Sequence, residues 1–156
     1  LISVVVFSFL GTFLFWIVFA GVFYLISMIF KGKGEFKRCL EVVGYGYIPQ
    51  IFGTLISLVV ALQYLPKIVV PKISAAAAQN PQLIQEATNA LLHDPAMVEM
   101  TQVAGVISIV FLLWSANCWI FGMKYARSLT MRDAALCVGV PILVYVLYMV
   151  YTISGI

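Results

Sequence analysis

Side chains that could carry out chemistry are few in this sequence, and their spacing matches no known reactive site. The three cysteines (Cys39, Cys118 and Cys137) form no CxxC pair and have only His93, far along the chain, as a conceivable co-ligand. There is no HExxH motif, and Gly32-Lys-Gly34 is too short to be a phosphate-binding loop. We therefore expect no metal, no cofactor and no catalytic residue, and we predict that the protein is not an enzyme.

Two amide side chains, Gln50 and Asn117, lie within long apolar segments. In a membrane, such an amide can hydrogen-bond a neighbouring helix and contribute about 1 kcal/mol or less. It can also contact a ligand or an ion in a cavity near the middle of the bilayer. The sequence leaves both interpretations open.

The elements that must position these amides are membrane spans. The chain has 156 residues, of which 63% are hydrophobic and 10% are charged, whereas soluble domains are about 45–50% apolar and about 25% charged. About 20 apolar residues suffice for one helical crossing, and four uncharged runs meet this length: 1–30, 42–65, 101–123 and 134–156. We predict an all-α, polytopic transmembrane helix bundle that forms a single domain over 1–156. The net charge of +3 lies in loops beside these runs, so we expect no nucleic-acid partner.

Basic residues between the spans predict the orientation. The short loops carry seven of them: Lys31, Lys33, Lys37 and Arg38 in 31–41, and Lys124, Arg127 and Arg132 in 124–133. The longer segment 66–100 has only Lys67 and Lys72. By the positive-inside rule, both short loops are cytoplasmic, while 66–100 and the C-terminus lie outside. We expect a multi-pass protein of a prokaryotic cytoplasmic membrane.

The outer segment contains two helix start signals. Asn80-Pro81 and Asp94-Pro95 each place a capping side chain before a proline at the first helical position. Apolar residues at helical spacing follow the first signal and predict a short amphipathic helix from Pro81 to His93. The second signal predicts that the third span begins as a long helix at Pro95.

Small and weakly polar residues mark the expected helix interfaces, because lipid provides no hydrophobic drive for association. They recur every three or four residues in three spans: Gly46, Gln50, Gly53 and Ser57; Thr101, Gly105, Ser108, Leu112, Ser115, Trp119 and Gly122; and Pro141, Tyr145, Tyr148 and Thr152. Asn117 is a further packing candidate. We expect spans two, three and four to form the packed centre and span one to face more lipid.

Two prolines predict irregular helices. Pro49 follows Gly44 and Gly46 at the start of the second span, and Pro141 follows Gly139 in the fourth. Proline removes a backbone hydrogen bond and clashes with the preceding turn. We expect each span to bend or unwind at its proline.

The segment from Gly32-Lys-Gly-Glu-Phe-Lys37 to Gly44-Tyr-Gly-Tyr-Ile-Pro49 resembles the Yip domain family of multi-spanning membrane proteins, named for interacting with Ypt/Rab GTPases. The resemblance extends from about Phe13 to Val150. It implies a five-helix bundle whose first span would precede Leu1, and the long outer segment is more like prokaryotic members. The family-type positions would be Gly32, Gly34, Phe36, Gly44, Tyr47 and Pro49.

The resemblance implies a non-enzymatic protein of membrane trafficking. It would organise membrane components or bind partners through its basic cytoplasmic loops. Its expected partners are membrane lipids, other membrane proteins or small GTPases; the sequence does not predict an oligomeric state. The alternative is a channel or transporter in which discontinuous helices at Pro49 and Pro141 line a midplane site near Gln50 and Asn117.

Overall fold

The computed structural model describes residues 2–70 and 80–155, and these residues contain helices and no strand. The helices in chain order are α1 (Ile2–Ile29), α2 (Phe36–Gly46), α3 (Ile48–Tyr64), the 3₁₀ turn η1 (Leu65–Lys67), α4 (Pro81–Leu92), α5 (Pro95–Ala126) and α6 (Met131–Ser154). The predicted all-α fold class is confirmed.

Among the described residues, four segments are long and apolar enough to cross a membrane: Val6–Ile29, Phe36–Lys67, Pro95–Ala126 and Met131–Ser154. They match the four predicted spans, although the second and third begin about one and a half turns earlier than the uncharged runs. The second span consists of two helices, α2 and α3, because the chain breaks at Tyr47. The predicted interruption is therefore present, two residues before Pro49, which lies in the first turn of α3.

The fourth span does not unwind at Pro141, so the predicted interruption of its helix is wrong. Helix α6 continues through Pro141 from Met131 to Ser154. Gly139 precedes this proline, but no other atom would contact a Cβ added at Gly139. The two prolines therefore differ in context. Pro49 follows Gly46, whose lack of a side chain leaves room for Trp119 beside the end of α2, and Pro141 has no such neighbour at Gly139.

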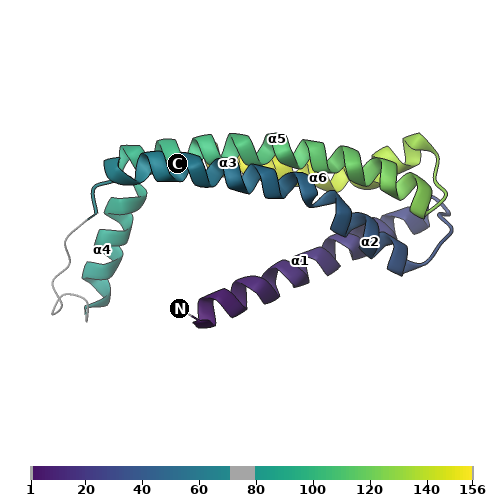
Figure 1. The fold of residues 1–156 in the computed structure, drawn as a ribbon, viewed down its shortest axis with the longest axis horizontal. Helices are drawn as coiled ribbons and strands as arrows, with labels where there is room; N and C mark the ends of the chain where they lie inside the picture. Colours follow the sequence, from purple (N-terminus) through teal and green to yellow (C-terminus); the bar gives the residue numbers. More distant parts are fainter. Residues whose placement is uncertain (1, 71–79, 156) are drawn as a thin grey trace.

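Helix α5 is the centre of the bundle (Figure 1). Helices α3 and α6 pack along it, α2 crosses it near its C-terminal end, and α1 packs against α2 and α6. Helix α1 diverges from α3 toward its N-terminus (Figure 1). Residues 6–15 of α1 are largely exposed, with Phe7 at 75%, whereas Ala20, Phe23 and Ser27 are buried. The packed core therefore includes part of the first span, which the sequence analysis placed at the periphery.

Helices α4, α5 and α6 begin at residues whose side chains cap them. The carboxylate of Asp94 accepts hydrogen bonds from the backbone N–H of Ala96 and Met97, and the Asn80 side chain accepts one from Gln82. Helix α4 matches the predicted outer helix to within one residue. It stands away from the bundle at the end of α5 (Figure 1), and it does not cover the bundle.

Candidate functional site

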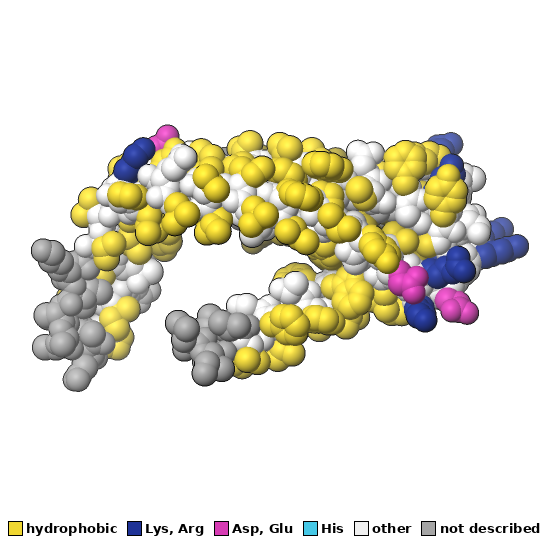
Figure 2. All heavy atoms as spheres, in the orientation of Figure 1, with side chains coloured by type: hydrophobic (Ala, Val, Ile, Leu, Met, Phe, Trp, Pro, Cys, Tyr) yellow, Lys and Arg dark blue, Asp and Glu magenta, His cyan; other side chains and the backbone are white. Residues whose placement is uncertain are grey.

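The basic residues of the two short loops gather at one end of the molecule (Figure 2). Lys31, Lys33, Lys37, Arg38 and Arg132 are exposed, and Lys124 is half-buried; we call these six residues the basic end. Residues almost a hundred positions apart meet here, since the Lys33 N–H donates to the Arg127 carbonyl at 2.9 Å. The structure thus brings the two predicted basic loops together.

Arg127 does not belong to this exposed surface, contrary to the sequence-based expectation. Its side chain is 2% exposed. Its Nε donates to the Ser27 hydroxyl at 2.9 Å, and its two terminal nitrogens donate to the carbonyls of Gly32 and Gly34. The guanidinium also lies 4.3 Å from the Tyr24 ring centroid. A planar fork of donors suits such a cluster of carbonyls, so Arg127 fastens the first loop to the end of α5.

The glycines at 32 and 34 fit this arrangement. Gly34 has φ +133, and a Cβ there would lie 2.5 Å from the Ala126 carbonyl oxygen. A Cβ at Gly32 would lie 2.9 Å from the Ser27 carbonyl oxygen. Only glycine allows the loop backbone to approach this closely with the required dihedral. The next family-type position, Phe36, packs edge to face on Tyr24 at 5.3 Å.

A surface groove of about 540 Å³ lies beside the basic end, between α2 and α5. Its lining comprises Glu35, Lys37, Arg38, Glu41, Val42, Gly122, Tyr125 and Ala126. Two carboxylates and two basic groups belong to this lining, so the groove has mixed charge. It suits a partner segment that carries both signs better than it suits a simple anion.

Trp119 satisfies the backbone at the break in the second span. In a continuous α-helix the Tyr47 N–H would donate to the Val43 carbonyl, but here it donates to the Gly44 carbonyl. The Trp119 indole N–H donates to the released Val43 carbonyl at 2.9 Å. A Cβ at Gly46 would overlap this indole, so glycine is needed for the approach. Trp16 makes a similar bond to the Leu40 carbonyl at 3.0 Å.

Most of the predicted packing residues of the second and third spans lie between helices, whereas Asn117 is exposed, and so are Tyr148 and Thr152 of the stripe predicted in the fourth span. A Cβ added at Gly53 would lie 2.9 Å from the Phe111 side chain of α5. Likewise, Gly105 faces Ile153 and Gly122 faces Val42. Ser57 and Ser115 have buried hydroxyls that bond no other described residue. By contrast, Gly44 has room, since its nearest neighbour, Trp16, would lie 3.5 Å from a Cβ. The small residues therefore let side chains of one helix reach the backbone of another.

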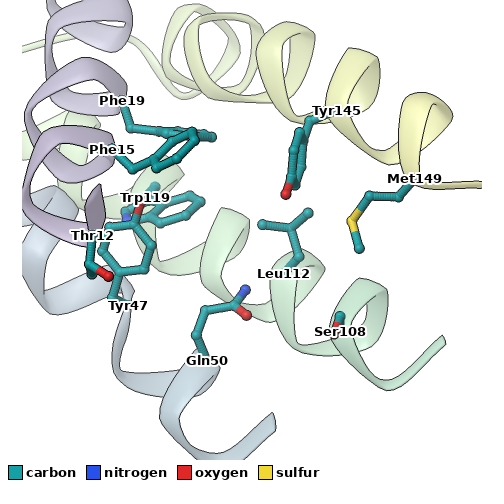
Figure 3. Close-up of a pocket in the computed structure, with 10 residues that line it drawn as sticks. All are labelled: Thr12, Phe15, Phe19, Tyr47, Gln50, Ser108, Leu112, Trp119, Tyr145 and Met149. Carbon is teal, nitrogen blue, oxygen red and sulfur yellow. The ribbon is translucent and has the colours of Figure 1, made fainter. Parts of the chain in front are cut away.

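An intramembrane cavity of about 370 Å³ lies where α1 diverges from α3 (Figure 3). Ten residues from the four spans line it: Thr12, Phe15, Phe19, Tyr47, Gln50, Ser108, Leu112, Trp119, Tyr145 and Met149. Figure 3 shows the Gln50 amide and the Tyr145 hydroxyl directed into the cavity from opposite walls. No charged side chain is part of this lining.

Asn117 is not part of this cavity, and the expectation that it accompanies Gln50 is wrong. It is exposed on α5, and no hydrogen bond joins its amide to another described residue. It lies two residues before buried Trp119, which places it about 200° around the helix. The stripe through Ser108, Ser115 and Trp119 already implied this outward position, so the signal was present in the sequence.

Sequence reasoning missed the aromatic wall of the cavity. Phe15 and Phe19 belong to an apolar run with no distinctive spacing, and their position in this wall depends on the angle of α1. Tyr47 and Phe19 both pack on Trp119, with ring centroids 5.3 and 6.1 Å away. Tyr47 had been named as a family-type position, and Trp119 and Tyr145 as members of packing stripes, but the sequence did not predict that they meet at one cavity.

Comparison with known proteins agrees with this architecture. A stretch of 54 residues is 48% identical to an uncharacterized protein of the archaeon Methanocaldococcus jannaschii, covering 35% of this chain and 38% of that protein. This relative supports a prokaryotic member, as the long outer segment predicted. No solved structure matches the chain. The family model of the Yip1 domain matches residues 1–153. With its four apolar spans and its broken second span, the chain belongs to the Yip1 domain family of membrane proteins.

Proposed function

We propose that this protein is a non-enzymatic membrane protein that organises membrane components or binds protein partners through its basic end, on the cytoplasmic side. The observation that carries the proposal is the fastening of two distant loops by Arg127, which presents six basic side chains on one surface. Anionic lipid headgroups are a natural contact, since each Lys or Arg near such a surface adds about 1 kcal/mol.

The groove beside the basic end favours a protein partner in addition to lipid. A lipid surface selects for positive charge alone, whereas Glu35 and Glu41 stand in the groove with Lys37 and Arg38. Charge patterns of both signs confer specificity and orientation on protein association. Small GTPases are one such partner class, which the family resemblance suggests.

In-cell photocrosslinking tests this proposal. A photoreactive amino acid at Lys37 and another at Arg132 probe the two loops, and one at Gln85 in α4 is the control at the opposite end. If the loops form one binding surface, both positions capture the same protein, and Gln85 does not. Recovery of different proteins from the two loops, or of nothing beyond the Gln85 control, contradicts the proposal.

A channel or transporter is the second candidate, and the cavity beside Gln50 is the observation that favours it. A solute pathway requires water at this depth. A cysteine at Ser108 in a Cys118→Ser background would then react with a small water-soluble thiol reagent in intact membranes. Absence of reaction, while the denatured protein reacts, argues against this candidate.

A further inference from the structure

The cavity between the four spans lies at membrane depth, away from both polar ends of the helices. Tyr145 follows Asp133 by twelve residues, which is about 18 Å along a helix, and Gln50 precedes Lys67 by about 25 Å. The hydrocarbon core of a bilayer is about 30 Å thick. The medium next to this cavity is therefore hydrocarbon, and a ligand that enters sideways comes from the lipid phase.

The walls of the cavity select for an uncharged, largely apolar molecule. Seven lining residues are aromatic or aliphatic: Phe15, Phe19, Tyr47, Leu112, Trp119, Tyr145 and Met149. A charged group here would have no counter-ion in the lining, and an unpaired charge in such surroundings is strongly disfavoured. The volume of about 370 Å³ lies within the range of small-molecule pockets.

Polar groups, among them the Gln50 amide and the Tyr145 hydroxyl, distinguish this cavity from a simple packing defect. The Gln50 amide and the Tyr145 hydroxyl point into it from α3 and α6 (Figure 3), and neither side chain bonds another described residue. In contrast, the Thr12 and Ser108 hydroxyls bond backbone carbonyls of their own helices, at 2.9 Å each. An amide without a partner in hydrocarbon is disfavoured. A ligand oxygen that accepts from both donors would remove this cost.

We propose that this cavity binds a neutral lipid that carries a carbonyl oxygen on a long hydrocarbon body. The carbonyl accepts hydrogen bonds from Gln50 and Tyr145, while the aromatic wall of α1 and α5 packs on the apolar part. Long-chain ketones, neutral esters and lipid quinones share this chemistry. The inference is independent of the basic end, because the cavity and the two loops have no lining residue in common.

The test is photolabelling of the purified protein in lipid nanodiscs. One probe is a clickable long-chain ketone with a diazirine in its chain, and the second is the matching hydrocarbon without the carbonyl. Labelled peptides that contain lining residues, with the ketone probe preferred, are the expected result. Equal labelling by both probes overturns the proposed role of the carbonyl. Competition by an unlabelled long-chain ester or by a decyl-substituted benzoquinone distinguishes the possible sources.

Four variants locate the site. Gln50→Leu and Tyr145→Phe conserve size and remove one donor each, and each is expected to lower ketone labelling about three- to tenfold. Labelling by the hydrocarbon should not change. Ser108→Phe fills the cavity and should lower labelling by both probes. Val106→Phe is its matched control, since Val106 is 58% exposed on the same helix and does not line the cavity. Unchanged ketone labelling in Gln50→Leu, Tyr145→Phe and Ser108→Phe overturns the proposal.

Discussion

Arg127 shows how one buried side chain can fix the relation between two loops. Its guanidinium donates hydrogen bonds to one hydroxyl and two backbone carbonyls, and it lies over the face of an aromatic ring. Hydrogen bonds to charged groups contribute about 1.5–3 kcal/mol each when both partners would otherwise be buried. The exposed basic residues around it have no comparable set of partners among the described residues, so their charges are available for contacts outside the chain.

We predict that Arg127→Met destabilises the protein and that Arg132→Met does not. Loss of the buried donor leaves the Gly32 and Gly34 carbonyls without their partner, and each buried acceptor left unsatisfied costs about 1–3 kcal/mol. An exposed substitution stays within about 0.5 kcal/mol. The thermal midpoint of the detergent-purified proteins, followed by size-exclusion chromatography after heating, measures both effects. Equal midpoints for the two variants would show that Arg127 is not a fastening residue.

Gly46 is the second residue on which the geometry depends, because its missing side chain makes room for the Trp119 indole. Gly46→Ala should lower the thermal midpoint, since overpacking of this kind costs about 1–3 kcal/mol. Gly139→Ala is the matched control. No atom lies within 4 Å of its hypothetical Cβ, and alanine favours helix by up to about 1 kcal/mol. A midpoint that is the same in both variants contradicts the close approach at Gly46.

At the scale of elements, the second span is a broken helix stabilised from a neighbouring helix. The chain leaves the α-helical pattern at Tyr47, and a side chain of α5 satisfies the carbonyl that this releases. Irregular backbone at membrane depth is tolerated only where protein or water satisfies it. The break is therefore a contact point between α2, α3 and α5, and its conformation depends on Trp119.

We expect Trp119→Phe to loosen this break. Phenylalanine retains much of the packing but cannot donate to the Val43 carbonyl, and a buried carbonyl without a partner costs about 1–3 kcal/mol. Hydrogen–deuterium exchange of peptides that cover 44–51 should become faster. Trp114→Phe provides the control, because Trp114 is 56% exposed and lies on another face of α5. Unchanged exchange in Trp119→Phe would mean that the indole does not hold the break.

At the scale of the whole molecule, charge and exposure divide the described residues into three zones. The basic end and the turn with Arg127 form one zone, the apolar spans the second, and α4 the third. Helix α4 runs steeply across the direction of α5 (Figure 1). If α5 crosses the bilayer, α4 lies near the membrane plane, which agrees with its amphipathic pattern.

The predicted orientation is testable with two single-cysteine positions in a Cys118→Ser background. The remaining native cysteines, Cys39 and Cys137, are buried and react little. By the positive-inside rule, Gln85→Cys should react with an impermeant thiol reagent in intact cells, whereas Lys33→Cys should react only after permeabilisation. The opposite pattern would invert the topology.

Much of this architecture is determined by local sequence, because spans, caps and turns depend on neighbouring residues. Uncharged runs predicted the four spans, Asn80 and Asp94 predicted the starts of α4 and α5, and glycine with proline predicted the break at Pro49. The prediction for Pro141 failed because a proline does not by itself unwind a helix. Its outcome depends on what packs against the released carbonyls.

Only the tertiary structure decided which polar groups meet. In the sequence, Arg127 and the exposed lysines are all basic residues of short loops. They differ in burial, because α1 and the first loop cover Arg127 alone. Gln50 and Asn117 also seemed equivalent, yet the rotation of α3 and α5 directs one into a cavity and the other outward. The sequence determined what crosses the membrane, because hydrophobicity and charge are properties of single segments. The structure decided what lies at the centre, because helix rotation and crossing angle arise only when the segments pack together.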